Sequence, residues 1–365
     1  MMNDQAYMDA ALDLAKAVQG QTSPNPPVGA VIVQNGAIVG FGAHMKAGEA
    51  HAEVHAIAMA GEKAHGATIY VTLEPCSHFG KTPPCADAII KSGIGRVVIA
   101  AMDKNPKVAG KGVERLQQAN ITVESGVGKK AADELYRPFF HFTETKTPYV
   151  TVKSATSLDG KTATVTGESK WITGEEARLD VHQYRNANDA ILVGVNTVLA
   201  DDPKLTVRLP NGGRNPLRII LDTHLRIPPE ANVVTDGEAE TWIFTGNNVL
   251  SEKLDLFTNN PEVTILQLEN NYIDIDQVLG YLGENRIMTL FVEGGAAING
   301  SFLMAKAVNQ LVTYMAPKLI GGESAPTSFA GLGIASIDDA INLSMKSVEM
   351  LGNDLKIISI PKEVK

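Results

Sequence analysis

Three residues with side chains that zinc prefers lie in the first quarter of the chain: His51, Cys76 and Cys85. One imidazole and two thiolates give three protein ligands and leave the fourth tetrahedral position open, as in catalytic rather than structural zinc sites. The two cysteines are the only ones in the sequence, and each follows a proline. Because two cysteines cannot build a disulfide framework, the pattern predicts a metal site.

Glu53 follows His51 by two residues, in the run His51-Ala52-Glu53. Taken alone, His51 and Glu53 are compatible with surface residues that open a helix, but together with the cysteines they favour a zinc site. The same residue types, with a shorter gap between the cysteines, are typical of zinc deaminases. In that chemistry the metal activates water for attack on an amine-bearing ring carbon, and Glu53 carries protons to the ring and to ammonia.

The composition is that of a globular protein, with 44% hydrophobic and 20% charged residues in a chain of 365. This length suits two domains. No apolar run approaches the roughly 18 residues of a membrane span, and the start lacks the features of a signal peptide. We therefore expect a cytoplasmic protein that does not enter the membrane.

The charge is unevenly divided along the chain. Residues 1–146 carry 14 basic and 14 acidic side chains, so the whole net charge of −9 belongs to residues 147–365. An acidic protein without a basic block argues against nucleic acid as the main partner. A small phosphorylated substrate held by a few local groups remains compatible with this composition.

Apolar periodicity predicts a strand–helix alternation in the first half. The expected helices cover residues 4–18, 52–64, 86–91, 113–119 and 131–140, and the expected strands 28–33, 37–43, 67–73, 96–101 and 121–124. Asn35-Gly36 between the first two strands is a hairpin signal. The pattern predicts a three-layer α/β/α domain over residues 1–146. The polar stretch 141–148 is the predicted linker.

The second half also reads as α/β, which makes residues 147–365 a second domain. Strands are expected at 149–154, 190–193, 218–221, 241–245, 263–266 and 288–292, with helices at 175–186 and 297–305. The run Phe291-Val292-Glu293-Gly294-Gly295 ends a strand and opens a helix, so backbone N–H groups could approach a phosphate there. A tight turn without a ligand explains the same glycines equally well.

Longer motifs resemble one family, the bifunctional riboflavin biosynthesis deaminase–reductases. In the first half these are SPNPPVGAV at 23–31, PCSHFGKTPPC at 75–85 and DKNP at 103–106. In the second half they are KSATSLDGK at 153–161, GESKWIT at 167–173 and the segment 193–208. The resemblance runs from about residue 5 to about residue 358. It implies a cytidine-deaminase-like first domain and a dihydrofolate-reductase-like second domain.

The same resemblance implies two consecutive reactions in riboflavin biosynthesis. The first removes the 2-amino group of 2,5-diamino-6-ribosylamino-4(3H)-pyrimidinone 5′-phosphate as ammonia, with Zn²⁺ as cofactor. The second uses NADPH to reduce the ribosyl group to ribityl, which gives 5-amino-6-ribitylamino-uracil 5′-phosphate. The family also implies a homo-oligomer. The sequence by itself does not distinguish NADPH from NADH, since it shows no recognisable clamp for a 2′-phosphate.

Site residues follow from the matching motifs. In the first half the resemblance implies substrate contacts from Asn25, His44, His78, Lys81, Asp103 and Asn105. In the second half it implies substrate contacts from Ser169, Arg185, Leu205, Arg208 and Glu293, with the arginines suited to phosphate. It implies cofactor contacts from Ala155, Trp171, Thr197, Asp201, Thr223, Gly295, Ala296, Ala297, Ile298, Asn299, Gly300 and Ser301.

Lys153 is the candidate proton donor of the reduction, because negative charge develops as C1′ is reduced. A salt-bridged lysine at a strand end is the alternative interpretation of this residue. In the same way, Asn25 could simply form a turn, and Trp171 could belong to the core.

Two other functions compete with this interpretation. A zinc deaminase acting on nucleic acid, with an added domain, is disfavoured by the neutral first half and by the eight residues between Cys76 and Cys85. A nucleotide-binding protein with structural zinc is disfavoured by Glu53 and by the count of three ligands. Ammonia release and NADPH oxidation would separate the enzyme from the binding protein.

Overall fold

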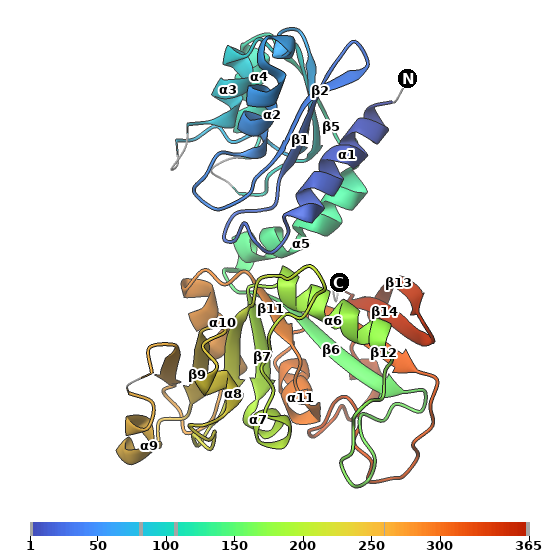
Figure 1. Ribbon diagram of the computed structural model, residues 1–365. Helices are drawn as coiled ribbons and strands as arrows, with labels where there is room; N and C mark the ends of the chain where they lie inside the picture. The colour runs from blue at the N-terminus through green and yellow to red at the C-terminus, as the bar shows by residue number, and fades with distance from the viewer. Residues whose placement is uncertain (1–2, 80–82, 106–108, 259, 363–365) are drawn as a thin grey trace. The chain divides into compact units, whose positions relative to one another are not determined.

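The computed structural model describes residues 3–79, 83–105, 109–258 and 260–362. The chain divides into two compact units, Met1–Lys146 and Thr147–Lys365. Each unit is built on one β-sheet with helices on both faces (Figure 1). Among the described residues no helix is long and apolar enough to cross a membrane.

The first unit contains a five-stranded sheet in the order β2-β1-β3-β4-β5. β1 pairs antiparallel with β2 and β3, whereas β3, β4 and β5 are parallel. Its elements are α1 (Asp4–Ala17), β1 (Gly29–Gln34), β2 (Ala37–Ala43), α2 (Ala52–Ala60), η1 (Gly61–Ala64), β3 (Thr68–Leu73), α3 (Cys85–Lys91), β4 (Arg96–Ala101), α4 (Lys111–Gln118), β5 (Thr122–Ser125) and α5 (Lys129–Thr145).

Two apolar layers hold this unit together. Helices α2, α3 and α4 cover one face of the sheet, and α1 and α5 cover the other (Figure 1). α2 carries alanines on its buried side, so it lies very close to β2: a Cβ on Gly42 would come within 2.5 Å of Ala52 O. The three-layer α/β/α arrangement expected for the first half is confirmed. The close packing fixes the N-terminus of α2, where His51 lies.

The second unit contains a nine-stranded sheet in the order β10-β9-β8-β7-β11-β6-β12-β14-β13. The strands from β10 to β12 are parallel, and β14 and β13 add an antiparallel hairpin. Its elements are β6 (Tyr149–Ser157), α6 (Glu175–Ala187), β7 (Ala190–Gly194), α7 (Val195–Asp201), β8 (Leu217–Leu221), α8 (Asn232–Thr235), β9 (Thr241–Thr245), α9 (Ser251–Asp255), β10 (Val263–Gln267), α10 (Ile275–Glu284), β11 (Thr289–Val292), α11 (Ala296–Met304), β12 (Gln310–Ala316), η2 (Ile337–Asp339), β13 (Leu343–Leu351) and β14 (Asp354–Pro361).

Helices again cover both faces of the second sheet. α6 and α7 contribute to the core on one face, and α10 and α11 to the core on the other. β11 lies between β7 and β6, so the chain order of the strands reverses there. Ligands of open α/β sheets bind outside the carboxyl ends of the strands at such a point. The topology therefore predicts a ligand site at the loops that follow β6, β7 and β11.

The predicted linker over residues 141–148 is wrong for most of its length. Helix α5 continues to Thr145 and ends at Lys146, which adopts a left-handed conformation. The hydroxyls of Thr143 and Thr145 donate to the carbonyls of Phe139 and His141, so polar side chains bond along the helix instead of breaking it. Polarity alone was therefore a poor sign of a loop. Strands β12, β13 and β14 and helices α7 to α10 were not predicted.

Candidate functional site

The three predicted zinc ligands lie together at the edge of the first sheet. His51 precedes α2, Cys76 follows β3 and Cys85 opens α3. His51 Nδ1 lies 3.1 Å from Cys85 Sγ and 3.7 Å from Cys76 Sγ. All three ligand atoms fall within 4.8 Å of one another. A spacing this short around two sulfurs and one imidazole nitrogen fits a tetrahedral zinc with one position left over.

Charge is already organised around these atoms. The pKa of Cys76 is lowered to about 4, because the Cys85 thiol and His51 bond to its sulfur, although burial opposes the shift. The backbone N–H of Cys85 also donates to Cys76 Sγ, at 3.3 Å. The pKa of Cys85 is raised, because its thiol donates to Cys76 and is buried. The lowered pKa of Cys76 favours its thiolate form, which is the form that binds a metal.

The carboxyl group of Glu53 is buried next to this cluster, with an exposed fraction of 3%. Burial raises its pKa to about 6, so it can both take up and release a proton near neutral pH. One of its oxygens, Oε2, has no hydrogen-bond partner among the described residues. A buried acceptor left open in this way is available to a ligand of the site.

Asn25 and His44 extend the cluster on one side. Nδ1–H of His44 donates to Ala50 O at 3.2 Å, which leaves Nε2 to accept from the Asn25 amide at 3.0 Å. Burial lowers the pKa of His44, so the ring is neutral. The rings of His44 and His51 meet edge to face, with centroids 5.0 Å apart. The structure thus places Asn25 and His44, two of the predicted substrate residues, beside the zinc cluster.

Glu74 was not singled out in the sequence, yet it ties the second predicted substrate segment to Cys76. Its buried carboxylate accepts four backbone N–H groups from the segment 103–113. The donors and distances are Asp103 at 3.3 Å, Gly110 at 3.0 Å, Gly112 at 3.0 Å and Val113 at 3.5 Å. The signal in the sequence was an acidic residue at the end of an apolar strand, directly before Pro75-Cys76.

Asp103 and Asn105 are joined within this segment, because the backbone N–H of Asn105 donates to Asp103 Oδ1 at 2.7 Å. Burial raises the pKa of Asp103, and the nearby His78 opposes that rise. Asp103 is buried and His78 exposed. Three of the predicted substrate residues therefore belong to one neighbourhood. Lys81, also predicted to contact the substrate, lies outside the described residues.

In the second unit, Arg185 on α6 and Glu293 after β11 form an ion pair, with Nε and Oε1 2.6 Å apart. Burial acts to raise the pKa of Glu293, but Arg185, Lys153 and His182 outweigh it, and the pKa is lowered. Lys153 on β6 lies beside Glu293, since Val152 pairs with Val292 in the sheet. Burial lowers the pKa of Lys153, which suits a proton donor.

His182 also belongs to this group, although its only signal in the sequence was its place one helical turn before Arg185. Its Nδ1 accepts the backbone N–H of Arg208 at 3.2 Å. Arg185 in turn donates to Thr206 O at 2.9 Å. The predicted substrate residues Leu205 and Arg208 thus lie on a loop that α6 holds; Leu205 is buried and Arg208 exposed.

All the predicted cofactor residues except Ala155 and Trp171 follow three adjacent strands, β8, β7 and β11, at their carboxyl ends. Thr223 follows β8, Thr197 and Asp201 lie on α7 after β7, and Gly295 is the N-cap of α11 after β11. α11 contains the remaining turn residues Ala296, Ala297, Ile298, Asn299, Gly300 and Ser301. A helix N-terminus at the strand-order reversal suits a dinucleotide phosphate.

Asn299 is the buried polar member of that turn. Its Nδ2 donates to Ser328 O at 3.0 Å, whereas its Oδ1 has no hydrogen-bond partner among the described residues. Gly294 is required nearby, because a Cβ there would come within 2.5 Å of the Ile298 side chain. The glycine lets the turn pack against Ile298, and the free Oδ1 of Asn299 is an acceptor that a bound nucleotide could use.

Ser169 and Trp171 lie in the exposed loop before α6. Lys170 between them forms an ion pair with Asp201, at 2.7 Å. The guanidinium of Arg178 lies 4.8 Å from the centre of the Trp171 ring. Trp171 is 63% exposed, so the interpretation of this residue as core is wrong. Ala155 instead packs against a core cluster from β6.

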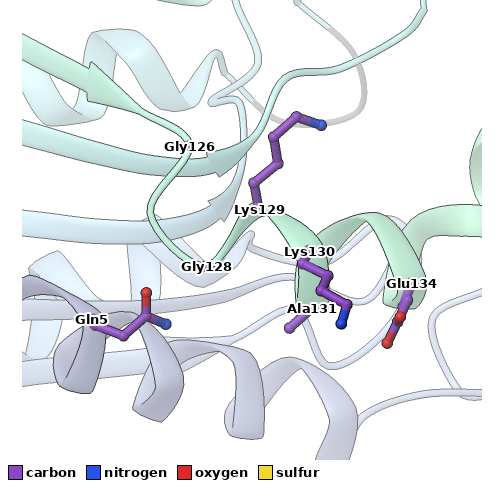
Figure 2. Close-up of a pocket in the computed structure, with 7 residues that line it drawn as sticks. All are labelled: Gln5, Gly126, Gly128, Lys129, Lys130, Ala131 and Glu134. Atoms are coloured by element: carbon purple, nitrogen blue, oxygen red, sulfur yellow. The ribbon is translucent and has the colours of Figure 1, made fainter.

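A separate hollow lies between the start of α5 and α1, on the face of the first sheet opposite the zinc cluster (Figure 2). Its lining residues are Gln5, Gly126, Gly128, Lys129, Lys130, Ala131 and Glu134. None of the predicted site residues lines it. The predicted zinc ligands gather instead at the end of β3 and at the starts of α2 and α3.

Comparison with known proteins gives the same division. Residues 1–101 match the cytidine and deoxycytidylate deaminase zinc-binding region, and residues 148–357 match the RibD C-terminal domain. The riboflavin biosynthesis protein RibD of Bacillus amyloliquefaciens is 53% identical over 99% of this chain and 97% of its own. RibD of Aquifex aeolicus is 49% identical over 97% of both chains.

Solved structures agree with the sequence relatives. Acinetobacter baumannii RibD superposes with a TM-score of 0.87 at 38% identity over 99% of both chains. A Thermotoga maritima diaminohydroxyphosphoribosylaminopyrimidine deaminase/5-amino-6-(5-phosphoribosylamino)uracil reductase superposes with a TM-score of 0.88 at 36% identity over 98% of both.

Fold and sites together define a two-domain enzyme that joins a zinc deaminase to a reductase. The chain belongs to the RibD family of riboflavin biosynthesis proteins. Its activities are the deaminase and reductase activities of that family, and its cofactors are Zn²⁺ and NADPH.

Proposed function

We propose that His51, Cys76 and Cys85 hold the zinc of the deaminase and that Glu53 moves the protons of the reaction. Bound there, zinc would supply an activated water molecule for hydrolysis of the amine. Glu53 takes up a proton and passes it to the ring and to the departing ammonia. The observation that carries this proposal is the buried carboxyl of Glu53 beside the three ligand atoms, with one oxygen free.

The substrate proposed for this site is 2,5-diamino-6-ribosylamino-4(3H)-pyrimidinone 5′-phosphate. Asn25 and the neutral His44 would orient the pyrimidine, since the Asn25 amide and the His44 ring lie beside the zinc cluster. His78 and Asp103 would contact the ring or the sugar. Lys81 and Asn105 would hold the ribose phosphate. This assignment is supported by the short links from Cys76 through Glu74 to the segment that contains Asp103.

For the second unit we propose that NADPH supplies a hydride that reduces the ribosyl group to ribityl. Lys153 would donate the accompanying proton, because its lowered pKa eases release and Glu293 holds it in place by charge. Arg208 and Arg185 are suited to the substrate phosphate. Ser169, Leu205 and Glu293 would complete the substrate site.

The cofactor would lie along the carboxyl ends of β8, β7 and β11. Gly295 and the first turn of α11 would face its phosphates, and the free Oδ1 of Asn299 supports a polar contact there. Thr197 and Asp201 come from α7, and Thr223 from the segment after β8. Ala155 and Trp171 would complete the cofactor contacts. We propose accordingly that residues 1–146 form the deaminase domain and residues 147–365 the reductase domain.

We also propose that the chain self-associates. β13 is an edge strand of the second sheet, and Met345, Val348 and Met350 on it are 70%, 55% and 60% exposed. An apolar edge strand of this kind is an interaction surface in many proteins. We also propose a cytoplasmic location, because Cys76 and Cys85 are not joined in a disulfide, which suits a reducing compartment.

The test uses the purified full chain and its zinc-loaded form. Glu53→Gln preserves the size of the side chain but removes its proton-carrying function, so we expect zinc content to be unchanged and ammonia release to fall by about 10²–10⁴-fold. Glu49→Gln, an exposed carboxylate before the same helix, is the matched control. Near-normal ammonia release from Glu53→Gln would exclude the proposed proton carrier.

A further inference from the structure

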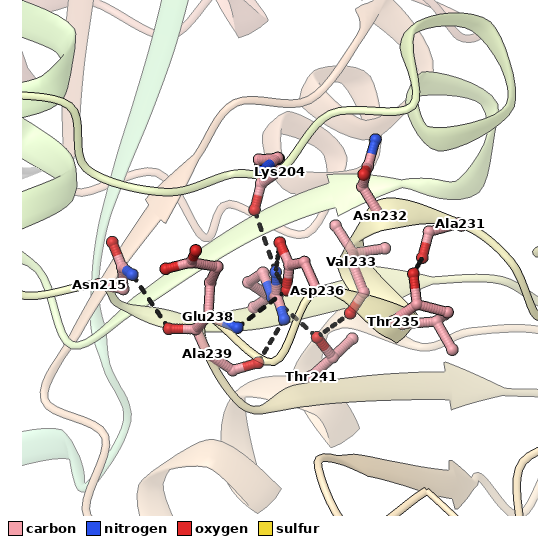
Figure 3. Close-up of polar contacts among 12 residues, drawn as sticks. Lys204, Asn215, Ala231, Asn232, Val233, Thr235, Asp236, Glu238, Ala239 and Thr241 are labelled. Carbon is pink, nitrogen blue, oxygen red and sulfur yellow. Dashed lines mark hydrogen bonds and ion pairs between the residues drawn. The ribbon is translucent and has the colours of Figure 1, made fainter.

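Arg218 is a fully buried cation in the reductase unit. It lies on β8, whose other residues are apolar, and its exposed fraction is 1%. Its Nη1 donates to both carboxylate oxygens of Asp236, at 2.8 and 3.0 Å. Figure 3 shows Asp236 among the polar groups that converge on this point. The side chain is thus paired and desolvated, and neither Arg218 nor Asp236 is among the residues assigned above to substrate and cofactor.

Stability alone does not account for such a pair. Removing two charges from water costs so much free energy that an apolar pair of similar volume is often at least as stable. The remaining donors of Arg218 indicate another role. Nε donates to Thr241 Oγ1 at 2.9 Å, Nη2 donates to Ala239 O, and Nη1 also donates to Lys204 O at 3.2 Å. The guanidinium therefore joins β9 and the segment before it to Lys204. Figure 3 labels the three partners, Thr241, Ala239 and Lys204.

Lys204 begins the loop 204–208, which contains the proposed substrate residues Leu205 and Arg208 and has no regular secondary structure. Leu205 has a φ of 55°, a left-handed conformation that costs energy for a residue with a branched side chain. Such a conformation persists only where the surroundings impose it. A loop of this kind needs external hydrogen bonds to keep one shape.

Side chains supply those bonds at four successive points. Besides the contact between Arg218 and Lys204 O, Asn215 Oδ1 accepts from Val207 N at 2.8 Å. The other two come from α6, where His182 accepts from Arg208 N at 3.2 Å and Arg185 donates to Thr206 O at 2.9 Å. Two of the four are arginines held by a largely buried carboxylate, Arg185 by Glu293 and Arg218 by Asp236, and Arg218 Nη1 donates both to Asp236 and to Lys204 O.

We propose that Arg218, fixed by Asp236, is a positioning residue that sets the shape of the loop 204–208 and so the place where Leu205 and Arg208 meet the phosphorylated substrate. The proposal rests on the substrate role proposed above for that loop. Arg218 acts through Lys204 O and does not touch the substrate. Its loss therefore affects substrate binding more than turnover of bound substrate.

The experiment removes both charges together, so that no buried ion is left unpaired. In Arg218→Met/Asp236→Asn the loop loses its first anchor, and the KM of the reductase for the deaminated aminopyrimidine is expected to rise about tenfold, the order expected for loss of a charged hydrogen bond. The kcat at saturating substrate and the deaminase rate stay within about threefold of the unaltered enzyme. Arg286→Met, an exposed arginine of the same unit, is the control.

An unchanged KM in the folded double variant overturns the positioning role. If that variant does not fold, Asn215→Ala decides, because it removes one bond to the same loop from a half-buried position. A severalfold rise in KM with unchanged kcat supports the proposal, and an unchanged KM overturns it. Arg208→Ala, measured in parallel, tests the loop itself. If its KM is unchanged, the substrate role of the loop fails, and the positioning role fails with it.

Discussion

Arg185 and Glu293 meet from different segments of the reductase unit and form two parallel hydrogen bonds, Nε to Oε1 at 2.6 Å and Nη2 to Oε2 at 3.1 Å. Their side chains are 11% and 10% exposed. Two parallel hydrogen bonds fix the plane of the Arg185 guanidinium as well as its distance from the Glu293 carboxylate. The pair therefore joins α6, which holds the loop 204–208, to the glycine turn that opens α11.

Glu293→Gln tests this link. A neutral amide leaves Arg185 buried without a compensating charge, so we expect the free energy of unfolding of the second unit to fall by about 3 kcal/mol. Reductase kcat/KM should fall at least tenfold, roughly the effect of 1.4 kcal/mol, while ammonia release is unchanged. Urea unfolding and NADPH oxidation measure the two effects. Glu284→Gln, an exposed carboxylate on α10, is the control, and equal losses in both variants would contradict the role of the pair.

His182 provides a test by pH. Burial, Arg185 and Arg208 lower its pKa from 6.5 to about 4, so the unfolded chain binds this proton more readily than the folded one. The stability contributed by the neutral ring is complete above 6.5 and is lost as the pH falls towards 4. Over this window, the unfolding free energy of wild type should fall more steeply than that of His182→Gln, which retains an acceptor for Arg208 N but does not titrate. Urea unfolding at each pH gives these free energies. If they change equally with pH in wild type and in His182→Gln, the pKa of His182 is not lowered in the folded protein.

Cys85→Ser tests the metal site. The protein should hold about one zinc per chain, and the variant should lose most of it, because a hydroxyl is a poor zinc ligand compared with a thiolate. Metal analysis of the purified proteins gives the result directly. His55→Gln, an exposed histidine on α2, should keep its zinc. Full zinc in Cys85→Ser would remove Cys85 from the ligand set.

Glu74→Gln tests the link between Cys76 and the segment 103–113. The amide replaces one acceptor oxygen of Glu74 by an NH2 donor. The two backbone N–H groups that bond to that oxygen then lose their acceptor. We expect the deaminase KM for the diaminopyrimidine to rise severalfold, with zinc content and reductase rate unchanged. Glu62→Gln, an exposed carboxylate of η1, is the control. A deaminase KM equal to that of the control would show that Glu74 does not position the segment.

The sequence predicted the zinc cluster because its members are chemically distinctive and few. Two cysteines and a His-x-Glu run leave little choice of partner, and the helix and strand signals around them were strong. The roles of Glu74 and Arg218 were not predicted, for the opposite reason. Their partners are main-chain atoms of segments distant in sequence, which no residue type marks. A charged residue inside or at the end of an apolar strand was the only sign.

The fold could be predicted in class but not in every boundary. The α/β layers followed from apolar periodicity, whereas α5 runs through the polar stretch expected to be a linker. β13 also escaped prediction, because it is exposed along most of its length and carries no buried alternation. Local sequence therefore indicated the α/β class, but it missed α10 and β12, which face a core, as well as β13, whose partner is a neighbouring strand.

The central claim is that one chain carries two separate active sites, and crossed activities test it most directly. Both activities are measured in Glu53→Gln and in Lys153→Ala, each with its own substrate. We expect Glu53→Gln to oxidise NADPH normally with the deaminated aminopyrimidine while losing ammonia release. We expect Lys153→Ala to release ammonia normally while losing most reduction. Loss of both activities in each correctly folded variant would contradict the account, because it would mean a single shared site.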